Sequence, residues 1–146
     1  MKSYLILALL FLPFFTIADI DHNKFDSIVW PDLKIENPVI KDVFVNVQND
    51  LEQKQIVIPA FIVKSWMKTD SGQPVFFLSA QPYVCEHSKP PHANQMIKLN
   101  NELNIELLSD NAIPVYAFGR IKVEKNKAGL FSSAYTLDLQ DIQPYE

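Results

Sequence analysis

The sequence predicts a mainly β protein with minor α content, folded as a small, partly open β-barrel of the oligonucleotide/oligosaccharide-binding (OB) type. Three observations predict this class. Short apolar runs alternate in the manner of strands, and polar segments rich in turn-forming residues separate them. Pro59 and Gly119 fall inside two of the runs, at positions typical of edges or bulges where a barrel strand bends. The last run, 135–142, alternates between apolar and polar residues, as expected for a strand with one solvated face.

The chain has 146 residues, a length typical of one domain, and its 48% hydrophobic and 21% charged residues indicate a globular protein. Residues 1–18 predict a cleaved signal peptide. Lys2 precedes an apolar run over 5–17, and Thr16-Ile17-Ala18 places small residues where a signal peptidase needs them. The run is short for a membrane span, although an uncleaved anchor is the alternative. We therefore expect residues 19–146 to form a single exported domain, periplasmic or secreted, that meets the membrane only during export.

The net charge and the single cysteine limit the classes of partner and site that the protein can have. Without residues 1–18 the chain has 12 basic and 17 acidic residues, a formal charge of −5. This acidic balance provides no basic surface for phosphates, so we expect no nucleic-acid partner. Cys85 is the single cysteine and cannot form an internal disulfide. A bare thiol is easily oxidised in an oxidising compartment, so we expect Cys85 to be buried, bound to a metal or paired with a partner.

The N-terminal part is expected to be irregular. Residues 19–27 are polar and predict a mobile arm in which His22 is an ordinary solvated histidine. Trp30 and Leu33 are large apolar residues that are expected to pin this arm to the domain. Asn37-Pro38 is typical of a helix start, and the apolar spacing that follows favours a helix. Alternating valines in the same stretch leave a strand as the alternative.

The remaining elements are expected to be strands joined by turns. Strands are predicted over 55–67, 75–80, 96–99, 113–123 and 135–142, with a turn at 69–74 and a charged hairpin turn at 124–129. The segment 102–108 fits either a strand or one helical turn. Both faces of the run 55–67 are apolar, so it is expected to be buried on both sides or to bend. Phe61 and Trp66 are large rings in this run, and we expect both in the core.

The candidate site lies between the second and third predicted strands. Cys85 and His87 are two residues apart, so on an extended backbone their side chains point to the same face. His92 follows past Pro90-Pro91, and this stiff pair could return it toward the same point. A thiolate with imidazoles suits Zn²⁺ or a copper ion. Three ligands with an open fourth position would make an exchangeable site.

Two other interpretations of this stretch remain open. Cys85 can be a small buried residue, with His87 and His92 as ordinary loop histidines. Alternatively, Cys85 and His87 can form a nucleophile and base, but that chemistry also needs an orienting group and an oxyanion site. No Gly-rich turn is present to supply backbone donors. Asn94 and Gln95 can orient a ring or, more commonly, satisfy backbone groups of the loop.

The chain resembles bacterial secreted proteins of the domain-of-unknown-function 3299 (DUF3299) family over nearly all of its mature length. The matching residues are Trp30 with Leu33, the run from Ile56 to Val63, Phe77-Leu78, Cys85-Glu86-His87, Pro90-Pro91, Asn94-Gln95, Pro114-Val115 to Gly119, and Ala134-Tyr135. The most specific part is the Cys-x-His pair followed by prolines and Asn-Gln. Part of the family's longer proline run is replaced by Ser88-Lys89 and His92-Ala93, and Ala60 stands where the family usually has glycine.

The resemblance implies a site at Cys85, His87, Asn94 and Gln95, whereas His92 is outside the family pattern and rests on spacing alone. Some relatives look associated with metal-uptake transporters, which favours the metal interpretation. We therefore expect an exported, non-enzymatic accessory protein that handles zinc or copper, with a transporter or another periplasmic protein as a candidate partner. A protein-interaction module that uses the barrel face or the proline loop is the alternative, and a thiol-dependent enzyme is the third hypothesis.

Overall fold

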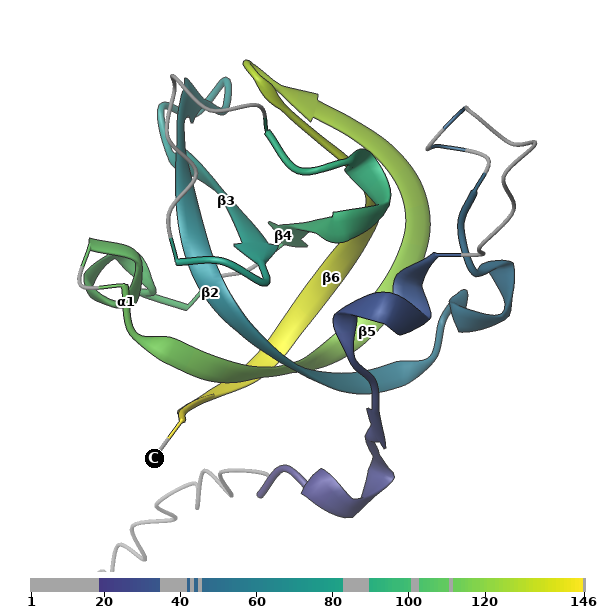
Figure 1. Cartoon of the computed structure of the whole chain (residues 1–146). Coiled ribbons are helices and arrows are strands. Elements are labelled where there is room, and N and C mark those ends of the chain that lie inside the picture. The colour runs from purple at the N-terminus through teal and green to yellow at the C-terminus, as the bar shows by residue number, and fades with distance from the viewer. Residues whose placement is uncertain are drawn as a thin grey trace, which may run out of the picture.

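The computed structural model describes residues 19–34, 42, 44, 46–82, 90–100, 103–110 and 112–145. They form a closed mixed barrel (Figure 1) of five strands, which are β2 (Gln55–Lys68), β3 (Pro74–Ser79), β4 (Met96–Asn100), β5 (Pro114–Ala128) and β6 (Phe131–Pro144). Neighbours follow the order β2-β3-β4-β6-β5, and β2 also pairs with β5. The β4–β6 pair is parallel and the others are antiparallel. The predicted mainly β, OB-like barrel is confirmed, but it is closed rather than partly open, because β2 is long enough to pair with both β3 and β5.

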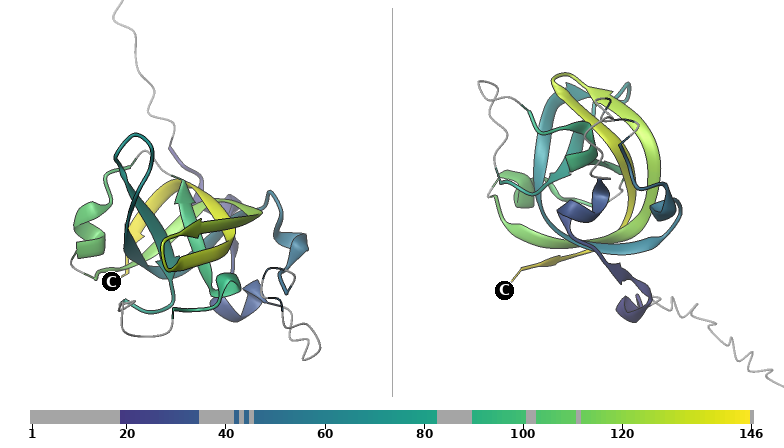
Figure 2. Two further views of the ribbon diagram at one scale, coloured as in Figure 1. Left: turned by 90° about the horizontal axis from the view of Figure 1, so that it is seen from above. Right: turned by 45° about the vertical axis from the view of Figure 1, so that its right-hand side comes forward.

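Short elements decorate the barrel. The two-residue strand β1 (Asp26–Ser27) runs parallel to the start of β2. Within the described residues there are four short 3-10 turns, which are η1 (His22–Lys24), η2 (Trp30–Leu33), η3 (Asn49–Leu51) and η4 (Ala93–Gln95). The helix α1 (Glu106–Asp110) lies between β4 and β5, to one side of the barrel in the views of Figure 2. No helix in this described part of the chain is long and apolar enough to cross a membrane.

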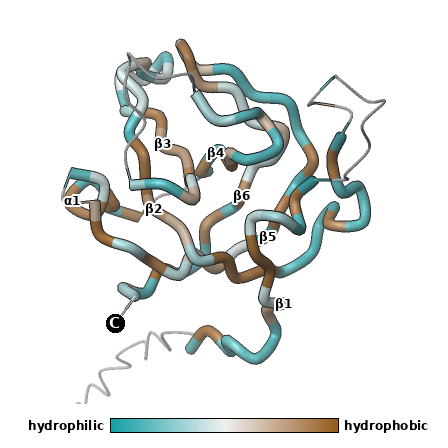
Figure 3. Tube along the Cα trace, viewed as in Figure 1, coloured by the Kyte–Doolittle hydropathy of each residue, from teal (hydrophilic) through white to brown (hydrophobic). Residues whose placement is uncertain are grey.

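β2 owes its length to an apolar residue at nearly every position. Alternate residues Ile56, Ile58, Ala60 and Ile62 are buried in the main core, which gathers the inward-facing side chains of all five strands. β2 and β3 accordingly carry long hydrophobic stretches (Figure 3). Pro59 pairs with β5 on one side only, because β1 pairs with 56–57 and β3 begins to pair at 61. Its missing N–H therefore removes no ladder hydrogen bond, and the predicted edge position is confirmed.

A second, smaller apolar cluster lies on the opposite face of the strands. It contains Val63, Phe77, Met96, Ala128 and Phe131. Phe77 follows Phe76 of the main core, so adjacent residues of β3 point to opposite faces of the sheet. Both faces of β2 and β3 are therefore buried over part of their length, as the apolar run 55–67 predicted. The Phe77 and Phe131 ring centroids are 5.6 Å apart, which brings the β5–β6 hairpin against this face.

Gly119 marks the bend predicted in β5. The β5–β6 register shifts between Phe118 and Gly119, as expected for a bulge. A side chain at this position would collide with the backbone oxygen of Asp138 and would lie 2.9 Å from the Cγ atom of Leu137. The glycine therefore allows the two strands to approach at the bend.

Three element predictions differ from the structure or are only partly covered by the described residues. The hairpin turn was expected at 124–129, but β5 continues to Ala128 and the chain reverses at Gly129 and Leu130. The charged residues are compatible with a strand because they point to solvent, and within this hairpin only Gly129 adopts a positive φ of 64°. The helix expected after Asn37 falls largely outside the described residues, and 49–51 within them form the 3-10 turn η3. Of the segment 102–108, residues 106–108 lie in the helical turn α1, and 103–105 are neither helix nor strand.

The expected exposure of His22 is confirmed, but the expectation of a loose arm is wrong because of the contacts that His22 makes. Its Nε2 atom lies 2.7 Å from Oδ2 of Asp141 and 3.2 Å from Nε2 of Gln143. Its ring is centred 4.6 Å from the ring of Phe118, which also packs edge-to-face with Phe25 at 5.4 Å. No local sequence pattern indicates these contacts, because they join residues more than ninety positions apart. The arm is therefore attached to β5 and β6.

The expected core positions of Trp66 and Phe61 are also wrong. Trp66 is 60% exposed, and Phe61 is only partly buried. β2 extends beyond the barrel core at its C-terminal end, so Trp66 has passed the last buried layer. A large ring in an apolar run is usually a core residue, and here strand length overrides that rule.

Candidate functional site

The loop between β3 and β4 carries the predicted site. Cys85 and His87 lie outside the described residues, whereas the two ends of the loop are described. Ser79 at the end of β3 pairs with Met96 at the start of β4, so the ends are held at neighbouring positions of one antiparallel ladder. Both residues are buried, at 1% and 0% exposure. The Ser79 hydroxyl also accepts a hydrogen bond from the Gln81 backbone N–H at 3.2 Å.

Asn94 and Gln95 form most of the turn η4, which leads from the loop into β4. Asn94 is 4% exposed, and its Nδ2 donates to the backbone oxygen of Asn46 at 3.0 Å. Gln95 donates through Nε2 to the backbone oxygens of Trp30 at 3.1 Å and of Asn94 at 2.9 Å. The two side chains thus tie the C-terminal end of the loop to segments that are more than forty residues away in sequence. Amides suit this task because they bond backbone groups that no strand reaches.

Trp30 extends this support to the barrel. Its indole N–H donates to the backbone oxygen of Pro59 at 2.8 Å, and its ring is 9% exposed. Pro59 has no strand neighbour on that side, so its carbonyl is free to accept this bond. The predicted pinning role of Trp30 and Leu33 agrees with their burial in the main core.

Tyr135 of β6 connects the same segments from inside the barrel. The side chain is fully buried, and its hydroxyl donates to the backbone oxygen of Leu33 and accepts from the Gln48 N–H, the latter at 2.8 Å. Burial raises the pKa of the Tyr135 hydroxyl, and the hydrogen bond from Gln48 opposes this increase only in part. From the sequence, Tyr135 was a residue of the alternating run 135–142 and part of the family resemblance. Its strict alternation identified the face but could not identify the bonding partners.

His92 is exposed and caps the start of η4, where its backbone oxygen accepts from the Gln95 N–H at 2.8 Å. Its imidazole therefore lies at the base of the loop and is open to solvent. Within the residues that the structure describes, no group of three or more His, Cys, Asp or Glu side chains is placed to hold a metal ion. A three-ligand site that includes His92 would therefore need at least one ligand from outside the described residues.

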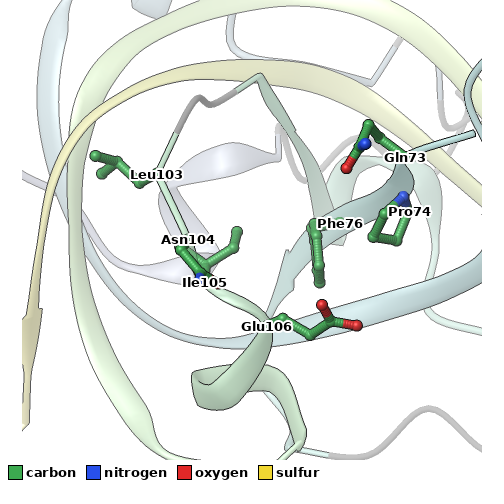
Figure 4. A pocket seen from close by; sticks show the side chains of 7 residues that line it. All are labelled: Gln73, Pro74, Phe76, Leu103, Asn104, Ile105 and Glu106. Atoms are coloured by element: carbon green, nitrogen blue, oxygen red, sulfur yellow. The ribbon is translucent and has the colours of Figure 1, made fainter. Parts of the chain in front are cut away.

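A cavity of about 500 Å³ lies beside α1 (Figure 4). Its lining comes from the β2–β3 turn, β3 and the segment before α1, and consists of Gln73, Pro74, Phe76, Leu103, Asn104, Ile105 and Glu106. The Glu106 carboxylate pairs with Lys64, and this hydrogen bond raises the pKa of the lysine. Sequence reasoning missed this cavity because its residues come from three separate elements and form no motif. Among its described lining residues, Glu106 is the one with an ionisable side chain.

A comparison with protein families gives a clear match. Residues 34–144 match the model of the family described as "Protein of unknown function (DUF3299)". The chain belongs to the DUF3299 family. A crystal structure of a DUF3299 family protein from Pseudomonas aeruginosa PAO1 is similar in fold, with a TM-score of 0.65 and 20% sequence identity. The match covers 84% of this chain and 97% of that one. No curated protein matches the chain.

The DUF3299 match includes the whole barrel and the loop between β3 and β4. At 20% identity the solved structure supports the shared fold alone. The predicted family resemblance is therefore confirmed, while secretion, a metal and a partner stay predictions.

Proposed function

We propose that this DUF3299 protein is an exported, non-enzymatic accessory protein that binds one Zn²⁺ or copper ion through Cys85 and His87, with His92 as a third ligand. The observation that favours the proposal most is that both ends of the loop that carries these three residues are held in place. Its ends are held together by the Ser79–Met96 pair, and its C-terminal end is fixed by buried or half-buried amides. A loop with fixed ends loses less conformational entropy when it gathers around an ion.

The ligand chemistry supports the same proposal. A thiolate and neutral imidazoles are soft to borderline donors, which Zn²⁺ and Cu⁺ prefer over the oxygen ligands suited to Mg²⁺ or Ca²⁺. Cys85 and His87 have the spacing that points both side chains to one face of an extended segment. His92 is exposed at the base of the loop, where it is free to contribute a nitrogen. A metal-bound thiolate would also be protected from the oxidation that threatens a bare thiol in an exported protein.

Location and partner follow from the same proposal. The N-terminal sequence fits a signal peptide, which would place the mature chain in the periplasm or outside the cell. With three protein ligands, a fourth coordination position stays open for water or an incoming ligand, through which the metal could be passed on. A metal-uptake transporter or another periplasmic protein is the class of partner that fits such a role.

Metal analysis of the exported protein tests the proposal. The mature chain is purified without chelators and without an affinity tag that binds metals, and its zinc and copper are measured per chain by mass spectrometry. We expect about one zinc or copper ion per wild-type chain. The double variant Cys85→Ser/His87→Ala, purified in parallel, should carry none. Equal metal content in the two proteins would contradict the proposal, as would wild-type protein free of metal that also fails to take up either ion on addition.

A further inference from the structure

Three large apolar side chains are exposed together at the tips of two hairpins. Trp66 and Met67 lie near the C-terminal end of β2, just before the β2–β3 turn, and are 60% and 39% exposed. Leu130 lies in the β5–β6 turn and is 53% exposed. The two turns lie at the same end of the barrel (Figure 1). We name Trp66, Met67 and Leu130 the hairpin-tip patch.

The patch is held in place by contacts between the two hairpins. A Cβ atom at Gly129 would lie 2.8 Å from Cζ2 of Trp66 and 3.0 Å from Cγ of Met67, so both side chains rest on the backbone of the β5–β6 turn. The Ser65 hydroxyl accepts from the Met67 N–H at 3.1 Å and donates to the backbone oxygen of Ala128 at 3.4 Å. The exposed indole therefore sits on a rigid base, and little conformational entropy remains to be lost when it binds.

The charges around the patch differ from those of the molecule as a whole. Lys68 and Lys127 flank it on β2 and β5, and both are exposed. Neither forms an ion pair with another residue of the described chain. Asp70 in the β2–β3 turn is the acidic residue of these two tips. The chain as a whole is acidic, with a net charge of −4, so its charge distribution favours this end for approach to an anionic surface.

We propose that the hairpin-tip patch docks the protein reversibly on an anionic lipid bilayer. Trp66, Met67 and Leu130 would enter the headgroup region, where tryptophan is favoured, and the two lysines would contact lipid phosphates. The small size of the patch favours lipid over a protein partner. A stable protein interface buries about 800 Å² on each side, far more than three side chains supply. Shallow insertion with a few basic contacts is enough for reversible membrane binding.

This inference goes beyond the proposed metal function and does not depend on it. It also goes beyond the sequence expectation, which gave the membrane a role only during export. A failure of vesicle binding would leave the metal content of the protein unchanged, so the two proposals fail separately.

Sedimentation with lipid vesicles tests the inference. Mature protein is mixed with vesicles of phosphatidylglycerol and phosphatidylcholine, or of phosphatidylcholine alone, and the bound fraction is measured. We expect binding to the anionic vesicles that falls about tenfold or more in Trp66→Ala, because the apolar contact of the indole is lost. Lys68→Gln should weaken binding about fivefold and make it less sensitive to salt. Leu107→Ala, at a side chain 70% exposed on α1, and Lys54→Gln are the matched controls and should bind like wild type.

Brominated lipids give a second readout. They should quench the fluorescence of wild type but not of Trp66→Phe, in which the buried Trp30 is the remaining indole. No binding by a folded wild-type protein would overturn the inference, as would equal binding by Trp66→Ala. A dimer in sedimentation that Trp66→Ala abolishes, without vesicle binding, would overturn it in favour of a second copy as the occupant. An acidic protein that binds this patch in place of vesicles would also overturn it.

Discussion

At the scale of single residues, a few polar side chains hold distant segments together. Asn94, Gln95 and the indole of Trp30 each donate to a backbone oxygen that no strand pairs. Tyr135 does the same from the barrel interior, where its hydroxyl satisfies both the Leu33 oxygen and the Gln48 N–H. Loss of such a group leaves buried partners without hydrogen bonds, which costs more than the bond itself contributes.

Replacement of Tyr135 by phenylalanine tests this reasoning. The ring stays, but the Leu33 oxygen and the Gln48 N–H lose their shared partner. We expect the free energy of unfolding to fall by about 1–3 kcal/mol, as measured by urea denaturation at pH 7. Tyr145→Phe is the control, and because this residue is 53% exposed its effect should stay within about 0.5 kcal/mol. Equal stabilities of wild type and Tyr135→Phe would show that the hydroxyl is not needed.

The same hydroxyl predicts a dependence on alkaline pH. Burial raises the pKa of Tyr135 in the folded protein above the value of about 10 of an unfolded tyrosine. The folded state therefore keeps a proton that the unfolded chain releases, and the free energy of unfolding falls as the pH rises through about 10 toward the raised pKa. Denaturation at pH 8 and pH 10.5 should show a smaller fall for Tyr135→Phe than for wild type. Parallel curves would contradict the burial of an ionisable hydroxyl.

At the scale of elements, the strands could be predicted and the short connecting pieces could not. The alternation in 55–67, 75–80 and 96–99 identified β2, β3 and β4 within one or two residues. Strands carry their own periodic signal because each side chain alternates between core and solvent. The turn η4 and the arm η1 depend on contacts with distant residues, and no local pattern encodes those partners.

The N-terminal arm provides a test at this scale. His22→Ala removes the contact with Asp141 and the ring contact with Phe118. We expect amide hydrogen exchange at 26–28 to become about five- to tenfold faster, corresponding to about 1 kcal/mol, while the barrel strands keep their protection. Lys24→Ala is the control, because among the described residues this lysine pairs within the arm, with Asp21 at 3.6 Å. Unchanged exchange at 26–28 would mean that His22 does not hold the arm.

At the scale of the whole molecule, the barrel class could be predicted from the number of strands and from the bends at Pro59 and Gly119. The closure of the barrel was seen only in the structure, where β2 is long enough to pair with two neighbours. The candidate site was predicted by residue type and spacing at Cys85 and His87. The structure adds what surrounds the loop, since it shows how Asn94 and Gln95 fix its end. The exposure of Trp66 could not be predicted, because a large ring in an apolar run is usually a core residue. Only the structure shows that β2 extends beyond the barrel core at this residue.

The net charge of the whole molecule predicts that it does not bind nucleic acid. OB-type barrels often bind nucleic acid, but fold alone does not determine function. The net charge of −4, which becomes −5 without residues 1–18, repels a phosphate backbone. We expect no binding of single-stranded DNA below about 100 μM at physiological salt, measured by fluorescence anisotropy with a labelled oligonucleotide. Salt-sensitive binding at sub-micromolar concentration would contradict this expectation.

The central claim is that the loop between β3 and β4 binds a metal through a thiolate, and a competitive titration tests it most directly. Mature wild type, Cys85→Ser, His87→Ala, His92→Ala and His22→Ala are titrated with Zn²⁺ and with Cu⁺ against a chromogenic chelator. We predict one tight site in wild type that weakens as the pH falls below about 6.5, because protons compete for the ligands. Affinity should fall most for Cys85→Ser, then for His87→Ala, then for His92→Ala, and should not change for His22→Ala. Equal affinity of wild type and Cys85→Ser for both ions would contradict the claim and leave Cys85 as an ordinary small apolar residue.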